Sequence, residues 1–363
     1  MAARKQATDQ DLPEADRLAG APHPRDTAIL FGQSAAEQDM LATYRSARMH
    51  HAWLIQGEEG IGKATLAYRF ARFVLANPDP NAAPLVSADN LDVASDHPVS
   101  RRIAAQAHPD LHVLRRAYDP SRKTLASAIS VDSVRKGLQF FAMTAGEGGW
   151  RIMIVDAADD MNVNAANALL KTLEEPPPRA LLLLISHAPG KLLATIKSRC
   201  RRLTLPPLGG DDLFHAVEAA GAGASLAALN AEDRQALLDL SRGSVRRALM
   251  FLDGGEGLLL WREISALLAQ APRLSDTRLH ALAAKLGRAG AQDDFSLAME
   301  LIGDWLSARL HAQVDAGAPR TSLARLAQVW EKTGRLAADT EIFHFDRKRV
   351  ILNVFRSIAA AFD

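Results

Sequence analysis

The stretch that decides the fold is Gly57-Glu58-Glu59-Gly60-Ile61-Gly62-Lys63-Ala64-Thr65. It fits the phosphate-loop pattern G-x-x-x-x-G-K, in which backbone N–H groups and a helix N-terminus face the phosphates and the lysine adds a positive charge. Residues 53–55 before the loop predict a strand and residues 65–70 after it predict a helix, which is the order that distinguishes this loop from a plain glycine-rich turn. The residues interpreted as binding nucleotide are Gly57, Gly60, Gly62, Lys63 and Thr65.

Two positions that support hydrolysis in such sites carry alanine. Ala64 stands where a serine or threonine hydroxyl normally holds Mg²⁺. Residues 151–155 predict a strand that leads into Asp156, the Walker B form whose aspartate holds Mg²⁺, but Ala157 follows where hydrolytic sites place a glutamate. We therefore expect a site that contacts ATP or ADP, holds Mg²⁺ weakly or not at all and turns over little, unless Thr65 replaces the missing hydroxyl.

Composition and length predict a multi-domain protein of the cytoplasm. The chain has 363 residues, 48% of them hydrophobic, a net charge of +1 and one cysteine, Cys200. No apolar run approaches the roughly 20 residues that span a bilayer, and the polar N-terminus resembles no signal peptide, so we expect no membrane partner. A single cysteine excludes an internal disulfide framework and a cysteine-rich zinc module. The charge balance provides no broad field for nucleic acid.

The pattern of elements changes at Pro206-Pro207. Before this point, apolar strand candidates alternate with helical stretches, which predicts a parallel sheet with crossover helices. The strand candidates are residues 53–55, 111–114, 152–155 and 181–185. After it the spacing is helical, with a second break near Gly254-Gly255. Residues that form apolar helical stripes are Leu297, Leu301, Ile302, Trp305, Leu306, Val350, Ile351, Val354, Phe355 and Ile358.

Several motifs along residues 30 to 250 carry a family resemblance. They are Leu30-Phe31-Gly32-Gln33, the run His50 to Leu54 before the loop, residues 167–177 (NALLKTLEEPP), Ser198-Arg199-Cys200 and residues 243–249 (GSVRRAL). Together with the loop they resemble the clamp-loader ATPases of the AAA+ class, and specifically the delta-prime subunits of bacterial DNA polymerase III. The C-terminal third is similar only in being helical.

The resemblance implies an α/β plus all-α architecture. A flexible tail, residues 1–24, would precede a RecA-like AAA+ domain with a parallel sheet over residues 25–205. A small helical lid would cover residues 206–255 and a helical collar residues 256–363. Asp159 and Asp160 are interpreted as the solvated start of a helix after the Walker B strand.

By resemblance, three further side chains have roles at phosphate groups. Arg199 of the SRC motif would be an arginine finger presented in trans to a neighbouring subunit. Ser186, or else His187 beside it, would be the sensor 1 residue at the end of a strand. Arg246 would be the sensor 2 residue, reaching the phosphates from the lid. The glutamates of residues 167–177 are not assigned as catalytic.

The function implied by the resemblance is that of a largely structural clamp-loader subunit. Its partners would be the gamma/tau and delta subunits, with the sliding clamp and primed DNA reached through the complex, and the isolated chain would show little or no ATPase. A hydrolysing gamma/tau-like motor subunit and a free-standing P-loop enzyme are the alternatives. The whole assembly would belong to a nucleotidyltransferase, the polymerase holoenzyme.

One feature of many relatives is missing from this sequence. They carry a four-cysteine zinc module, whereas residues 77–110 contain no cysteine, so we expect no zinc. His97, His108 and His112 match no compact ligand spacing and are interpreted as surface histidines. The basic group formed by Arg115, Arg116, Arg122 and Lys123 is interpreted as a solvated loop, with a DNA groove as the alternative.

Overall fold

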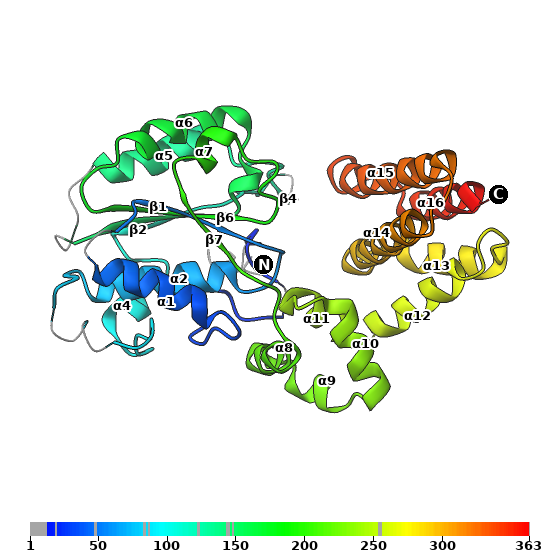
Figure 1. Cartoon of the computed structure of the whole chain (residues 1–363), viewed down its shortest axis with the longest axis horizontal. Coiled ribbons are helices and arrows are strands. Elements are labelled where there is room, and N and C mark those ends of the chain that lie inside the picture. The colour runs from blue at the N-terminus through cyan, green and yellow to red at the C-terminus, as the bar shows by residue number, and fades with distance from the viewer. Residues whose placement is uncertain are drawn as a thin grey trace, which may run out of the picture. The chain divides into compact units, whose positions relative to one another are not determined.

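The structure is a computed structural model (Figure 1). It describes residues 13–18, 20–46, 49–82, 85, 88–121, 124–142, 146, 149–252 and 256–362. Contacts divide the chain into two compact units. The first comprises Met1–Ala228 with Leu238–Ala248, and the second comprises Leu229–Leu237 with Leu249–Asp363.

The first unit is built on a five-stranded parallel sheet. The strands, in spatial order, are β2 (Leu111–Leu114), β5 (Arg151–Val155), β6 (Ala180–Ser186), β1 (Ala52–Gln56) and β7 (Arg201–Thr204). The central strands are almost continuously buried, as expected for a parallel sheet covered on both faces. The four strands predicted from apolar runs are confirmed. The sequence analysis missed β7, an edge strand in which only Leu203 is buried.

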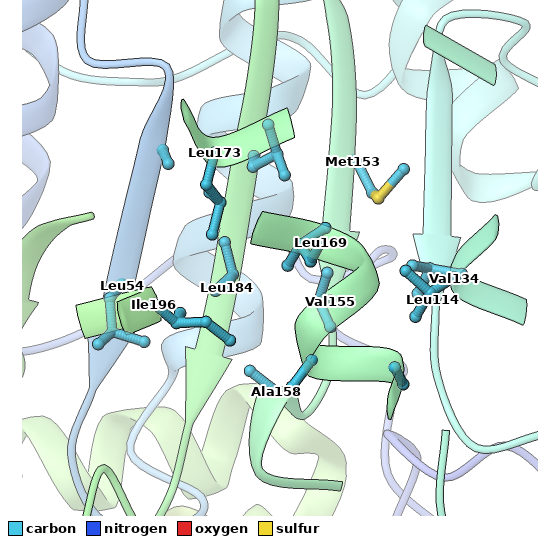
Figure 2. Close-up of a cluster of buried hydrophobic side chains, with 14 of the residues drawn as sticks. Leu54, Leu114, Val134, Met153, Val155, Ala158, Leu169, Leu173, Leu184 and Ile196 are labelled. Atoms are coloured by element: carbon cyan, nitrogen blue, oxygen red, sulfur yellow. The ribbon is translucent and has the colours of Figure 1, made fainter. Parts of the chain in front are cut away.

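Helices cover both faces of this sheet (Figure 1). One layer contains α1 (Ser34–Arg45), α2 (Lys63–Ala76) and α4 (Pro98–Ala104), and the other contains α5 (Val131–Ala142), α6 (Val163–Glu174) and α7 (Ala194–Lys197). Figure 2 shows Leu169 and Leu173 of α6 and Ile196 of α7 in one buried cluster with Val155 and Leu184 of the sheet. This core fixes the ends of α6 and α7. A short hairpin, β3 (Tyr118–Asp119) with β4 (Thr124–Leu125), lies outside the sheet.

The described part of the N-terminal segment is not the flexible tail that we expected. Arg25 donates to Glu14 at 2.8 Å, Arg115 donates to Asp16 at 3.0 Å, and His23 Nε2 lies 3.2 Å from Asp16. Burial alone would raise the pKa of Asp16, but the adjacent His23 and the charge of Arg115 lower it. Buried charges are tolerated when they are paired in this way.

The ion pairs of Arg115 and Arg116 show that these residues do not lie in a solvated loop. The Arg115 side chain is only 19% exposed because it is bound by the N-terminal carboxylates, and Arg116 pairs with Asp160 at 3.0 Å. Arg115 is therefore part of the packing of the first unit and not a solvated loop residue. Arg122 and Lys123 lie outside the described residues.

The segment after Pro206 is helical, as predicted. It contains α8 (Gly210–Val217), the π-type turn η3 (Glu218–Ala222), α9 (Gly223–Ala227), α10 (Ala231–Ser241) and α11 (Val245–Leu252). Asn230 caps α10 through a bond from Asp233 N to its side chain at 2.8 Å. The division into two units passes through α10 and α11, so the predicted boundaries of a separate lid stay a prediction. Gly254 and Gly255 lie outside the described residues.

The second unit is helical in its described part. After α11 come α12 (Glu256–Leu268), α13 (Asp276–Leu286), α14 (Gln292–Asp315), α15 (Arg320–Phe343) and α16 (Arg347–Phe362). Helix α14 packs on α12 and α15, and α16 packs on α13 and α15. The predicted stripes form this core, except that Trp305 is half-buried at its edge against Phe362. Among the described helices, none is long and apolar enough to cross a membrane.

Candidate nucleotide-binding site

The residues predicted to bind nucleotide gather at the carboxyl ends of the strands. The loop of residues 57–62 leaves β1 and enters α2 at Lys63. Ser186 ends β6 directly beside Gln56 in the sheet register, and Asp156 follows β5. Ligands of open parallel sheets bind at this edge, where connections leave in opposite directions.

Two loop glycines have backbone conformations that other residues rarely adopt. The φ angle is +80° at Gly60 and +98° at Gly62. A Cβ atom added to Gly60 would lie 2.4 Å from Ser244 Oγ and 2.5 Å from Arg246 Cβ, both at the start of α11. Glycine at position 60 therefore allows α11 to pack closely on the loop, and the loop glycines also allow the backbone conformation of the loop.

Lys63 begins α2, and its ammonium binds carbonyl groups of the loop. Its Nζ donates to the carbonyl of Gly57 at 2.7 Å and to that of Glu58. Burial lowers the pKa of Lys63 to about 8, while the charges of Glu59 and Asp156 oppose that shift. A phosphate group would replace these loop carbonyls as the partner of the ammonium.

Asp156 is buried at the end of β5. Burial and the charge of Asp16 together raise its pKa to about 7, while the charge of Lys63 opposes the shift. The carboxyl is thus partly protonated near neutral pH, whereas a metal ligand must be ionised. Ala64 and Ala157 add no oxygen, so the residues present fit nucleotide phosphates better than they fit Mg²⁺.

Asp159 is a residue of this site that sequence reasoning placed wrongly. It lies in the short 3-10 helix η2 (Ala158–Asp160), ahead of α6, but it is bound by neighbouring groups instead of being solvated. Its carboxylate accepts bonds from Ser186 Oγ at 2.7 Å, from Ala188 N at 3.0 Å and from His187 N. The hydroxyl of Ser186, the predicted sensor 1 residue, is therefore bound to a carboxylate of its own chain.

The start of α11 closes over the loop. Arg246 Nη1 donates to Glu59 Oε1 at 2.8 Å, Ser244 Oγ donates to the carbonyl of Glu59 at 2.7 Å, and Val245 N donates to the carbonyl of Gly60 at 2.9 Å. The sequence predicted Arg246 near the phosphates. It did not predict that the carboxylate of Glu59 would be the acceptor for Arg246.

Gln33 supports the loop from the other side. Its buried side chain donates through Nε2 to the carbonyls of Ile61 at 3.2 Å and Pro206 at 2.9 Å. This contact explains the closeness of the Leu30-Phe31-Gly32-Gln33 motif to the site. The loop is thus held by protein groups on both sides.

Arg199 is the one predicted site residue that the structure does not bring to the loop. It lies between α7 and β7, and Arg201 at the start of β7 pairs with Trp53 near the start of β1. At about 3.3 Å per strand residue, Arg199 is roughly 15 Å from the loop end of the sheet. Its side chain is 34% exposed, and its Nη2 lies 2.6 Å from Glu174 Oε1.

The three histidines considered as metal ligands lie apart and make local contacts. His97 Nδ1 accepts a bond from Val99 N, His108 Nδ1 accepts one from Asp110 N, and the His112 ring stacks on Phe140. In the described ranges, the one group with metal-ligand geometry is Glu14, Asp16 and His23. Arginine side chains already bind both of its carboxylates.

The sheet order and the loop define the class of the protein. The first strand in sequence, β1, lies between the fourth and fifth, β6 and β7, and the phosphate loop follows it. An acid follows the third strand and a polar residue ends the fourth. This is the arrangement of a RecA-like P-loop protein of the AAA+ class.

Comparison with known proteins finds relatives of part of the chain. Residues 32–209 match the family described as DNA polymerase III, delta subunit. The chain is 41% identical over 160 residues to the DNA polymerase III subunit delta' of Pseudomonas aeruginosa, and the match covers 44% of each chain. This region of the chain is similar to the DNA polymerase III delta-prime subunits.

Two further similarities are broader and weaker. Over 256 residues the chain is 29% identical to the DNA polymerase III subunit tau of Salmonella typhimurium, covering 68% of this chain and 36% of tau. A DNA polymerase III gamma subunit-related structure from Thermotoga maritima is 18% identical with a TM-score of 0.45, covering 90% of this chain and 100% of that one. The chain spans less than half the length of the curated relatives named here.

Proposed function

We propose that this chain is a largely structural subunit of the DNA polymerase III clamp loader, which supplies Arg199 in trans to a neighbouring ATPase site. The observation that carries the proposal is the separation of two sets of residues. The chain's own loop lies at one end of the sheet, and the partly exposed Arg199 lies at the other. An arginine at that end of the sheet is too far from its own loop to contact phosphates bound there, and it can contact phosphates bound by a neighbouring subunit.

The chain's own site would hold ATP or ADP without rapid turnover. The loop amides from Gly60 to Thr65 and the Lys63 ammonium would bind the phosphates, and Arg246 would reach them after leaving Glu59. The phosphates of a bound nucleotide would be the anionic acceptors for these amide, ammonium and guanidinium donors. With alanine at positions 64 and 157, the site lacks the hydroxyl for Mg²⁺ and the carboxylate that orients attacking water.

The neighbour's site would depend on Arg199. An arginine finger stabilises charge that develops on the transferring phosphoryl group and contributes about 10³–10⁵ in rate. The planar guanidinium donates in a fixed fork, which the point charge of lysine cannot reproduce. Arg199 meets the physical requirement for a finger, because it is partly exposed and is mounted on elements packed into the core.

The partners that follow from this role are the gamma/tau and delta subunits, and through them the sliding clamp and primed DNA. The similarity to tau extends over 68% of this chain, consistent with related subunits of one assembly. The helical second unit, with exposed Trp330 and Phe343, is the region that we assign to packing between subunits. Such an assembly would work in the cytoplasm as part of the polymerase holoenzyme.

The proposal is tested by substitution of Arg199 in a loader reconstituted with its partner subunits. Arg199→Ala should leave assembly intact and reduce the ATPase rate stimulated by clamp and primed DNA by at least 10²-fold, since a finger contributes about 10³ or more. Arg199→Lys should not restore it. The matched control is Arg202→Ala, an exposed arginine on β7. An assembled Arg199→Ala loader that turns over ATP at the original rate would refute the finger.

A hydrolysing motor subunit is the alternative within the same family. Thr65, next to Ala64, is the residue that would have to hold Mg²⁺ in that case. Purified chain that hydrolyses ATP at about 1 s⁻¹ or faster, a common enzyme rate, would favour the motor and exclude the structural role. If the chain were a free-standing P-loop enzyme, it would turn over a second substrate. A pull-down with this chain would then recover no loader subunits.

A further inference from the structure

Arg199 is bound by groups of its own chain. Its Nη2 lies 2.6 Å from Glu174 Oε1 in an ion pair, and its Nη1 donates to the carbonyl of Thr195 at 3.0 Å and to Ser198 Oγ at 3.2 Å. We propose that Glu174 is a positioning residue, whose carboxylate orients the Arg199 guanidinium toward the phosphates of the neighbouring subunit. This inference rests on the proposed role of Arg199 as a trans finger.

Some donor groups of Arg199 are bound within the chain, and others remain for the phosphates of a neighbouring subunit. A guanidinium has five N–H groups, and both of the hydrogen bonds named here come from Nη1. Within the described part of the chain, Nε makes no such bond and Nη2 makes the ion pair with Glu174. Bidentate recognition of a phosphoryl group takes two parallel N–H groups, which Nε and Nη2 can supply. The carboxylate therefore fixes the plane of the guanidinium without occupying all of its donors.

Glu174 is mounted on a rigid support. It is the last residue of α6, directly after Leu173, which is 2% exposed in the core of the first unit. Helix α6 also packs against α7, the helix that leads to Arg199. Both side chains thus start from backbone that is fixed by the same apolar cluster. A finger held in this way enters a neighbour's site with less loss of rotamer freedom.

The charge of Glu174 does not cancel that of Arg199. The two side chains are 50% and 34% exposed, so water screens the pair and keeps its contribution small. Orientation is then the main effect of the carboxylate. Glu175, the C-cap residue of the same helix, is exposed as well, which makes it a matched control with the same charge.

The experiment compares Glu174→Ala, Glu174→Gln and Glu175→Gln in the reconstituted loader, each with Arg199 and with Arg199→Ala. The readouts are kcat and KM for ATP hydrolysis with sliding clamp and primed DNA present. We expect Glu174→Ala to lower kcat by about two- to fivefold, the factor that loss of an exposed ion pair gives. KM and assembly should not change, because a finger acts on the transition state. Glu174→Gln should lower kcat less, since its amide oxygen still accepts a bond.

The double variants separate positioning from general damage. With Arg199→Ala present, Glu174→Ala should have no further effect, because it acts only through Arg199. An unchanged or higher kcat for Glu174→Ala, or an equal fall in the Arg199→Ala background, would overturn the assignment of Glu174. If Arg199→Ala itself hydrolyses ATP normally, the trans finger and the positioning residue both fail.

Discussion

The substitution Gly60→Ala tests the contact between the phosphate loop and the start of α11. The methyl group would enter the space now filled by Ser244 and Arg246, at 2.4 Å and 2.5 Å from their side-chain atoms. Atoms at those separations must move apart. The bonds from Ser244 and Val245 to the loop carbonyls would lengthen with them.

The expected loss of stability follows from two terms. Placing a non-glycine residue at a φ of +80° costs about 1–2 kcal/mol. Overpacking of a close contact costs about 1–3 kcal/mol. Gly60→Ala should therefore lower the unfolding free energy of the first unit by about 2–5 kcal/mol. Gly190→Ala is the control, because a Cβ atom there meets nothing within 4 Å, and its effect should be about 1 kcal/mol or less.

The assay uses Cys200, the only cysteine of the chain. Its side chain packs against the core of the first unit, so labelling by a thiol reagent in increasing urea reports the unfolding of that unit. This matters because a chain with two units need not unfold in one step. A difference of less than about 1 kcal/mol between Gly60→Ala and Gly190→Ala, below both strain terms, would refute the contact between the loop and α11.

Three further predictions concern single groups. Burial raises the pKa of Cys200 to about 12, so native protein at pH 8 should react with a thiol reagent at least 10²-fold more slowly than unfolded protein, whose thiol has a pKa of about 8.5. Burial raises the pKa of Asp156 to about 7, so the native state binds a proton that the unfolded state lacks, and stability falls as pH rises from about 4 to 7. Asp156→Asn should remove that fall in urea titrations at pH 5 and 8. Glu59→Gln should free Arg246 and tighten ATP binding about two- to fivefold by calorimetry, whereas Glu58→Gln, without that ion pair, should not.

The sheet could be predicted because its strands are buried on both faces. Such strands are short apolar runs, and four of them were visible in the sequence. The edge strand β7 was not, since Arg201 and Arg202 interrupt its apolar character. Arg201 is accommodated because its guanidinium lies over the Trp53 ring at 4.8 Å. A contact of that kind depends on the neighbouring strand and leaves no local signal.

The polar contacts of the site escaped prediction for a related reason. Asp159 binds Ser186 across 27 positions, Glu59 binds Arg246 across 187, and Arg115 binds Asp16 across 99. Periodicity reports which face of an element is buried, but it does not report which charged side chains meet across the fold. The motif positions located the site, and only the three-dimensional structure showed how its charges are paired.

The phosphate loop keeps its glycines although the chemistry around it is reduced, and the structure gives a physical reason. Gly60 is needed where α11 approaches the loop, and Gly62 has a left-handed conformation at the start of α2. Both requirements hold with or without nucleotide, so the loop can lose catalytic groups at positions 64 and 157 while its shape is retained. Arg199 depends on neither feature, because the core under α6 and α7 supports it at the opposite end of the sheet. The proposed role of Arg199 is therefore compatible with alanine at positions 64 and 157 of the chain's own site.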